Sequence, residues 1–331
     1  MSMGHELVVF ASTGERPKGR LPIKASDEPF VYRNWEMYRY GDRIRDDEPL
    51  DLFFDAKPML KEGYDVLFIE KPTCTPLSKL SGVFNDIKER ARVAAIMHEG
   101  RIPIHRRFYG LRWDAASVFD ERFMRLYGHL LNAEKVAVVP YPCHPIALGS
   151  RGDARAKLGL PEEKKMVLAF GLRANALWPI MPILAKVARN IDMCLLILVE
   201  HEKFLGIAEA LRAKYDFVLL RIDAPSFEDL YTYLHASDAV LLHRPAADYV
   251  PVSSSVHLCL GSLRPILCPD NNFFEKCDGV LKYSGPEDLE DKLRLALEEG
   301  LPKEVMERAL RYIKEREPRK VARELLDLTL S

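Results

Sequence analysis

Three consecutive serines, Ser253, Ser254 and Ser255, separate an apolar strand from an apolar helix in the second half of the sequence. The strand is predicted over 239–242 and the helix over 256–260, where Gly261 ends it before a further strand. A strand–loop–helix unit of this kind points backbone N–H groups and the positive end of the helix into a cleft beside parallel strands. The unit therefore predicts an anion site, with phosphate as the usual occupant. The alternative is an ordinary crossover, because serine is also a preferred N-cap residue.

Two series of apolar strands, separated by helical segments, would position these serines. The first series covers 6–11, 65–70, 93–97 and 136–140, and the second covers 166–171, 193–199, 217–221, 239–242 and 265–268. Continuous apolar runs bounded by helices are typical of parallel sheets covered on both faces. We expect an α/β protein with two Rossmann-like doubly wound domains, residues 1–148 and 149–315, and ligands in a cleft at the carboxyl ends of the strands. A C-terminal helix over about 316–331 is expected to pack back onto the first domain.

The composition is that of a soluble globular protein. The 331 residues are 48% hydrophobic and 29% charged, with a net charge of -1. A balanced charge gives no general attraction to nucleic acid or to a membrane surface. The six cysteines show no CxxC pair and no ligand spacing with histidine, so a zinc site is not expected. Several stand in apolar runs, such as Cys194 and Cys259, where cysteine behaves as a small buried hydrophobe, and a reducing cytoplasm is the expected location.

Most familiar cofactor and catalytic motifs are missing from the sequence. There is no GxGxxG after the first strand and no GxxxxGK[ST], which disfavours a dinucleotide oxidoreductase and a P-loop ATPase. GxSxG, HExxH and EF-hand loops are also missing, as is an Asp-x-Asp at a strand end. We therefore expect chemistry in a cleft without a metal ion or a covalent cofactor.

In their order and spacing, several segments resemble the retaining glycosyltransferases of the GT-B fold, and among them family 4. The segments are DVLFIEKP (65–72), VAAIMHEG (93–100), VAVVPYPCHP (136–145), DARAKLGLPEEKKMVLAFGLR (153–173), FEDLYTYLHASDAVLLHRP (227–245) and the serine unit. The resemblance covers most of the chain and is strongest from about residue 150 to 300. It implies two Rossmann-like domains facing a cleft, with a nucleotide-diphosphate sugar as donor substrate bound by the second.

The resemblance also assigns roles to particular residues. It places His98 at the end of a strand, facing donor and acceptor across the cleft, and Arg173 on the donor diphosphate together with the three serines. Asp248 stands where the first glutamate of the family's Glu-x7-Glu motif would hold sugar hydroxyls. Gly14, with the basic loop over 16–20, is a candidate to close over the donor phosphates. Each has a plainer alternative: a core or turn histidine, a surface ion pair, a loop carboxylate and a surface loop.

Two positions depart from the family's pattern. Val256 stands where the second glutamate of the motif would grip the ribose, and Leu177 stands where a lysine is expected to meet the diphosphate. Neither side chain can do this, so the donor and even the activity are less certain than the fold.

The sequence thus predicts a metal-independent, retaining glycosyltransferase, a hexosyltransferase, acting on a carbohydrate or lipid-linked acceptor. Alternatives are a non-catalytic or regulatory relative that binds a phosphorylated ligand, and a sugar-nucleotide epimerase or phosphorylase on the same fold. The stretch over 101–113 interleaves basic and aromatic residues, which suits a solvated loop with buried aromatics better than a peripheral membrane contact. No partner among nucleic acids is expected.

Overall fold

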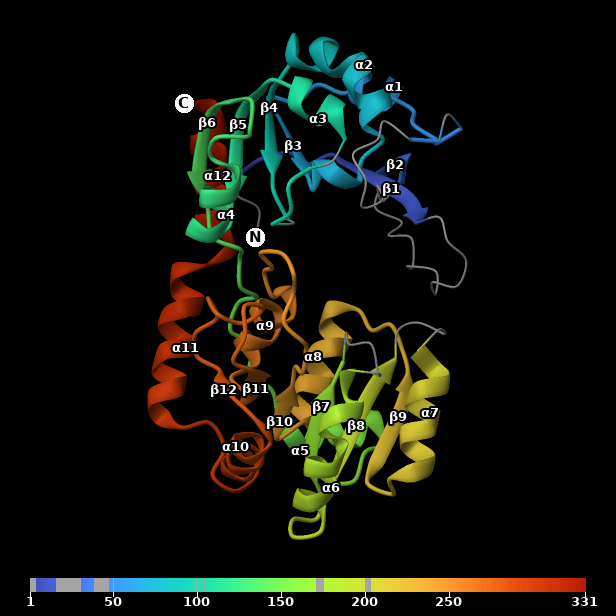
Figure 1. Cartoon of the computed structure of the whole chain (residues 1–331), viewed down its shortest axis with the longest axis vertical. Helices are drawn as coiled ribbons and strands as arrows, with labels where there is room; N and C mark the ends of the chain where they lie inside the picture. Colours follow the sequence, from blue (N-terminus) through green and yellow to red (C-terminus); the bar gives the residue numbers. More distant parts are fainter. Residues whose placement is uncertain are drawn as a thin grey trace.

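The structure, a computed structural model, forms two lobes, one above the other in Figure 1. It describes residues 4–15, 31–38, 48–49, 51–98, 100–103, 105–170, 176–199 and 204–331. The N-terminal lobe contains β1 to β6 and the C-terminal lobe contains β7 to β12.

The C-terminal lobe is a doubly wound sheet, as the sequence predicts. Its six parallel strands lie in the order β12-β11-β10-β7-β8-β9, so the order reverses between β7 and β10, where ligands bind in folds of this type. The strands are β7 (Lys165–Ala169), β8 (Met193–Val199), β9 (Val218–Ile222), β10 (Ala239–Leu241), β11 (Ile266–Pro269) and β12 (Leu281–Tyr283). The helices are α5 (Arg151–Leu158), α6 (Met181–Ala188), α7 (Leu205–Lys214), α8 (Phe227–Ala236), α9 (Ser254–Cys259), α10 (Pro286–Glu298) and α11 (Lys303–Glu315).

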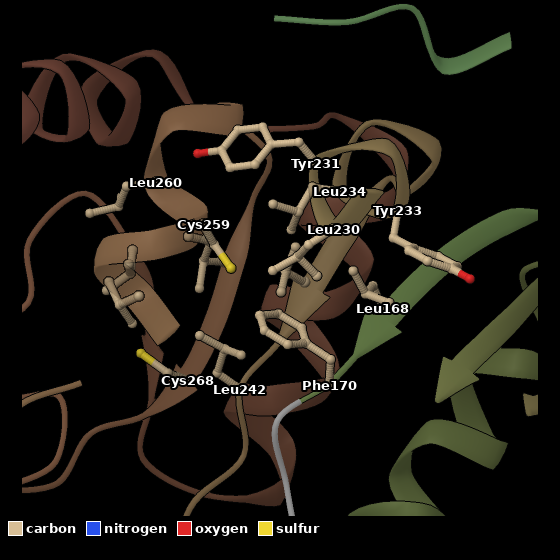
Figure 2. Close-up of a cluster of buried hydrophobic side chains, with 14 of the residues drawn as sticks. Leu168, Phe170, Leu230, Tyr231, Tyr233, Leu234, Leu242, Cys259, Leu260 and Cys268 are labelled. Carbon is tan, nitrogen blue, oxygen red and sulfur yellow. The ribbon is translucent and has the colours of Figure 1, made fainter. Parts of the chain in front are cut away.

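One face of this sheet packs against α8 and α9. Figure 2 shows Leu168 of β7 and the adjacent Phe170 close to Leu230 and Leu234 of α8, with Cys259 of α9 in the same cluster. Burial of apolar side chains on this scale fixes α9 on the sheet. All six cysteines are buried and free, which confirms their interpretation as small hydrophobes. Burial raises the pKa of the Cys194 thiol to about 11, so that thiol stays protonated at neutral pH.

The N-terminal lobe contains a second parallel sheet in the simple order β3-β4-β5-β6. Its strands are β3 (Val66–Glu70), β4 (Arg92–Ile96), β5 (Trp113–Val118) and β6 (Ala133–Val138), and its helices are α1 (Lys57–Lys61), α2 (Leu77–Lys88), α3 (Arg106–Gly110) and α4 (Glu121–Tyr127). The last helix of the chain, α12 (Pro318–Leu330), also lies on this lobe (Figure 1), where Arg92 Nε donates to Thr329 O at 3.2 Å and Leu325 contacts the core.

The prediction for the first strand is wrong in its bounds and in the sheet to which the strand belongs. The sequence suggests a buried strand over 6–11 in the main sheet, but β1 (Val9–Glu15) pairs in parallel with β2 (Val31–Met37) in a separate two-stranded sheet. Its described side chains are half-buried rather than buried. The Nε1 atom of Trp35 donates to Phe10 O at 3.1 Å and ties the two strands together.

The stretch over 101–113 combines exposed basic residues with buried aromatic ones, as the sequence suggests, although part of it is helical rather than loop. It forms α3 and leads into β5, and His105, Phe108 and Trp113 are all buried. Phe108 and Trp113 are therefore part of the core, whereas Tyr109 is 37% exposed. In the part of the chain that the structure describes, no helix combines the length and apolar character needed to cross a membrane.

Candidate functional site

The two lobes touch where the chain leaves β4 and where it leaves β10. Gly100 N donates to Val250 O at 3.0 Å and Val250 N donates to Gly100 O at 3.1 Å, which makes a short antiparallel bridge between the lobes. A Cβ atom on Gly100 would lie 2.3 Å from the Cβ of Val250, so only glycine allows this approach. Residues 243–252, here called the Asp248 loop, thus connect β10 to the serines and rest on the N-terminal lobe.

His98 lies at this boundary, after β4. Its ring packs edge-on against Phe119 with centroids 5.1 Å apart and against Tyr141 at 6.2 Å. Its Nε2 atom lies 3.6 Å from Glu70 Oε2 at the end of β3. The imidazole is partly exposed and lies beside a carboxylate. Such a position suits a side chain that contacts a substrate.

A chain of ring contacts links His98 to the serines. Tyr141, in the segment joining the lobes, packs on His257 of α9 at 5.0 Å. His257 Nδ1 lies 2.7 Å from Ser253 O and its Nε2 lies 3.1 Å from the Tyr312 hydroxyl. Because a carbonyl only accepts, Nδ1 carries the proton that bonds Ser253 O. Burial lowers the pKa of His257 to about 4, so the ring is neutral at pH 7. The structure therefore brings His98 and the serine row to the same boundary.

The three serines differ in their surroundings. Ser253 is buried and is the N-cap of α9, because its Oγ accepts from Val256 N at 3.4 Å. Ser254 is exposed and Ser255 is half-buried. A cavity of about 30 Å³ adjoins Ser253, lined also by Tyr141, His257 and Tyr312. That volume has room for water but not for a nucleotide sugar. Ser254 is thus the serine open to a ligand, while Ser253 caps the helix.

Asp248 lies beside the lobe boundary with an 81% exposed side chain. Its Oδ1 accepts from Arg101 Nη2 of the N-terminal lobe at 2.6 Å. The guanidinium of Arg101 also lies 4.5 Å from the centre of the Tyr249 ring. The carboxylate is therefore accessible, and it is paired across the boundary.

The remaining predicted positions lie elsewhere. Gly14 lies near the end of β1, in the two-stranded sheet of the N-terminal lobe. Arg173 and the basic loop over 16–20 lie outside the described residues. Val256 and Leu177 are entirely buried in the C-terminal lobe. A longer charged side chain at either place would enter the core, so neither position is accessible to a ligand in this structure.

The carboxyl ends of β10 and β12 carry a pair that the sequence alone does not single out. His243 Nδ1 and the Tyr283 hydroxyl share a hydrogen bond, and the two rings are stacked at 6.0 Å. Burial lowers the pKa of His243 and raises the pKa of Tyr283, so both are neutral at pH 7. In the sequence, the signal that could have identified His243 is its position directly after a predicted strand. Among the described residues, no cluster of three His, Cys, Asp or Glu side chains is placed to hold a metal ion.

Solved structures share this two-lobe arrangement. No protein-family model matches the sequence. The UDP-forming trehalose-phosphate synthase of Burkholderia xenovorans, in complex with glucose-6-phosphate, has a TM-score of 0.61 at 9% identity over 83% of this chain and 75% of its own. The sucrose-phosphate synthase of Thermosynechococcus elongatus has a TM-score of 0.56 at 14% identity over 81% and 73%. The E. coli trehalose-6-phosphate protein bound with UDP-2-fluoro glucose has a TM-score of 0.53 at 9% identity over 82% and 75%.

At these identities the likeness establishes architecture and not chemistry. The parallel sheets in two lobes, the reversal of strand order between β7 and β10, and the superposition on these synthases agree with one another. The chain has the GT-B fold of glycosyltransferases, as the sequence resemblance implies.

Proposed function

We propose that this protein is a metal-independent, retaining glycosyltransferase resembling family 4, which moves a sugar from a nucleotide-diphosphate sugar to an acceptor hydroxyl. One observation carries the proposal. The residues that the resemblance selects from the two halves of the chain lie at one lobe boundary. They are His98 on one side and Asp248 with the serines on the other. The ends of the parallel strands in both lobes supply them, where ligands of such folds bind.

Each residue then has a definite task. Ser254, with backbone N–H groups at the start of α9 and with Arg173, would hold the donor diphosphate and stabilise the leaving phosphate as its charge develops. Asp248 would accept hydrogen bonds from the sugar hydroxyls. His98 would face the acceptor hydroxyl, whose proton passes to the leaving phosphate. Attack on the face from which the phosphate leaves preserves the anomeric configuration without a protein nucleophile. Contact between the lobes would exclude water, which otherwise hydrolyses the donor.

The solved neighbours suggest the first ligands to try. One of them is bound with UDP-2-fluoro glucose and another with glucose-6-phosphate. We propose a nucleotide sugar as donor and a carbohydrate or lipid-linked hydroxyl as acceptor for this chain.

A second candidate function is a non-catalytic protein that binds a phosphorylated ligand on the same fold. Val256 favours it, since the position at which the resemblance expects a ribose-binding glutamate is an entirely buried valine. Such a protein would bind a nucleotide or sugar phosphate and release no product.

Binding and turnover separate these candidates. Thermal unfolding with UDP, GDP and ADP and with their sugars should show a raised midpoint for one nucleotide series, because a ligand of the folded state stabilises it by mass action. Arg173→Ala should abolish most of that shift and Ser254→Ala should reduce it modestly. Turnover of the stabilising nucleotide sugar, including its slow hydrolysis, supports the transferase. Stabilisation without any product supports the binding protein, and no stabilisation by any nucleotide contradicts the transferase.

A further inference from the structure

We infer that Arg122 and Asn272 are positioning residues that fix the conformation of the Asp248 loop, and that Arg122 makes part of this arrangement depend on contact between the lobes. The catalytic consequence rests on the proposed function, because it assumes that Asp248 binds the donor sugar. The positioning itself rests on hydrogen bonds within the protein.

Asn272 holds the Asp248 loop on both sides of Asp248. Its Oδ1 accepts from Ala247 N at 2.9 Å, and its Nδ2 donates to Ala247 O at 2.7 Å and to Tyr249 O at 3.2 Å. The single amide therefore uses donors and an acceptor together on the two residues that flank Asp248. An alanine at this position would remove all three bonds.

Arg122 holds the same loop from the other lobe. It lies on α4, and its side chain is only 9% exposed. Its Nη2 donates to Pro251 O at 3.0 Å, at the end of the Asp248 loop, and its Nη1 donates to Asn272 O at 2.9 Å. One guanidinium therefore contacts the loop and also the residue that clamps it.

Carboxylates on both sides orient the Arg122 guanidinium. Asp120, the N-cap of α4, accepts from Nε at 3.1 Å and from Nη2 at 2.8 Å. Glu275 of the C-terminal lobe accepts from Nη1 at 3.1 Å. Such a planar fork, held by charge-assisted bonds, has little freedom to turn. The position of α4 therefore determines where Pro251 O and Asn272 O lie.

Separation of the lobes would break together the bonds that Arg122 makes to the C-terminal lobe. A buried guanidinium that loses its carbonyl partners must be rehydrated, and Pro251 O and Asn272 O would each lose a charged donor. The bridge between Gly100 and Val250 would open in the same movement, because it joins the same loop to the same lobe. The contacts that Arg122 and Gly100 make with the C-terminal lobe thus exist only while the lobes touch, whereas the three bonds from Asn272, in the same lobe as the loop, do not depend on that contact.

Amide hydrogen exchange of the full chain, without any ligand, tests the positioning. In Asn272→Ala and in Arg122→Lys, the amides of Ala247 and Val250 should exchange roughly tenfold faster or more, since each variant removes at least one buried or charged hydrogen bond to the loop. Lysine retains the charge of Arg122 but cannot make the forked contact, so this variant separates charge from geometry. Arg125→Lys on the exposed side of α4 and Asn190→Ala on the surface are matched controls that should leave both amides unchanged.

Unchanged exchange of Val250 in both Asn272→Ala and Arg122→Lys would overturn the inference. A second measurement is independent of loop exchange: with a turned-over donor, both variants should lose kcat at least tenfold with a smaller change in KM, because binding to the C-terminal lobe remains while Asp248 is misplaced. A loss of the same size in kcat/KM that comes from a raised KM alone argues against a positioning role. Faster exchange in a protein that turns over no nucleotide sugar supports the inference and contradicts the proposed transferase.

Discussion

Arg101 of the N-terminal lobe and Asp248 of the C-terminal lobe form an ion pair across the lobe boundary, with Nη2 and Oδ1 2.6 Å apart. Their side chains are 46% and 81% exposed, so water screens the pair. Exposed ion pairs typically contribute about 0–1 kcal/mol to stability. The pair therefore matters less for holding the lobes than for what it does to Asp248. It occupies the carboxylate that we propose as the ligand of the donor sugar.

Two single substitutions separate these roles. Asp248→Asn and Arg101→Gln break the same ion pair, but only the first removes the carboxylate. We expect Asp248→Asn to lower kcat/KM about 10-fold to 100-fold, since a hydrogen bond to a charged group contributes about 1.5–3 kcal/mol. Arg101→Gln should retain most of the activity, and neither should change the free energy of unfolding by more than about 1 kcal/mol. Steady-state kinetics and urea unfolding measure both quantities.

Equal losses of activity in the two variants would show that the ion pair, rather than the carboxylate, is what the reaction needs. Raised salt gives an independent check. Screening weakens the exposed ion pair in the wild type, whereas neither variant has this pair, so the pair can make only the wild-type activity depend on salt.

The bridge between Gly100 and Val250 gives a second prediction. In Gly100→Ala the new Cβ would lie 2.3 Å from both the Cβ and the carbonyl oxygen of Val250, so the bridge must open or shift. We expect a loss of roughly 1–3 kcal/mol in the free energy of unfolding, as for other overpacked contacts. Gly82→Ala is the matched control, because Gly82 lies inside α2, where an added Cβ would have nothing within 4 Å, and helix propensity predicts a gain of about 0.5–1 kcal/mol. A Gly100→Ala protein as stable as the wild type contradicts the assigned contact.

Five of the six described strands of the C-terminal lobe could be predicted from the sequence, because most of them are apolar runs buried on both faces, whereas β12 is not predicted. The residues of β8, for example, form one uninterrupted apolar run, and the structure buries all of them. The strand β5 escapes prediction because its sequence, WDAASV, includes two polar residues. The structure buries Asp114 and bonds its Oδ2 to Val93 N at 2.6 Å and its Oδ1 to Lys88 Nζ at 2.8 Å. Tertiary partners for a buried carboxylate cannot be inferred from hydrophobic periodicity.

The candidate site could be predicted only in part, for a similar reason. His98 and the serines follow apolar strands or open a helix, so local sequence marks them. Arg122 and Asn272 carry no local signal, because the role that we propose for them depends on contacts between residues 150 apart in the chain. For Ser253 the local sequence is compatible both with phosphate binding and with capping of the helix. The hydrogen bond from Val256 N shows the capping.

The serines therefore give a third prediction, in which stability and binding separate. Ser253→Ala should cost about 0.5–1 kcal/mol in the free energy of unfolding, at the lower end for an N-cap because its 3.4 Å bond is long. Ser254→Ala should leave stability unchanged, since this residue is exposed, and should weaken binding of the nucleotide sugar several-fold. Urea unfolding and calorimetric titration measure the two effects. Weaker binding in Ser253→Ala together with unaltered binding in Ser254→Ala would show that Ser253, and not Ser254, contacts the ligand.

The last prediction concerns pH and His257. Burial lowers the pKa of His257 from 6.5 to about 4, so the unfolded chain binds a proton at this residue more readily than the folded chain between these values. Stability contributed by the neutral ring is complete above pH 6.5 and is lost as the pH falls toward 4, by up to about 3 kcal/mol. His257→Gln lacks this loss. The difference in unfolding free energy between wild type and His257→Gln should therefore shrink on acidification, whereas the exposed His129→Gln should follow the wild type throughout. Urea unfolding at half-unit steps from pH 7 to 4 measures it, and a difference that stays constant over this range would show that His257 titrates alike in the folded and unfolded chains.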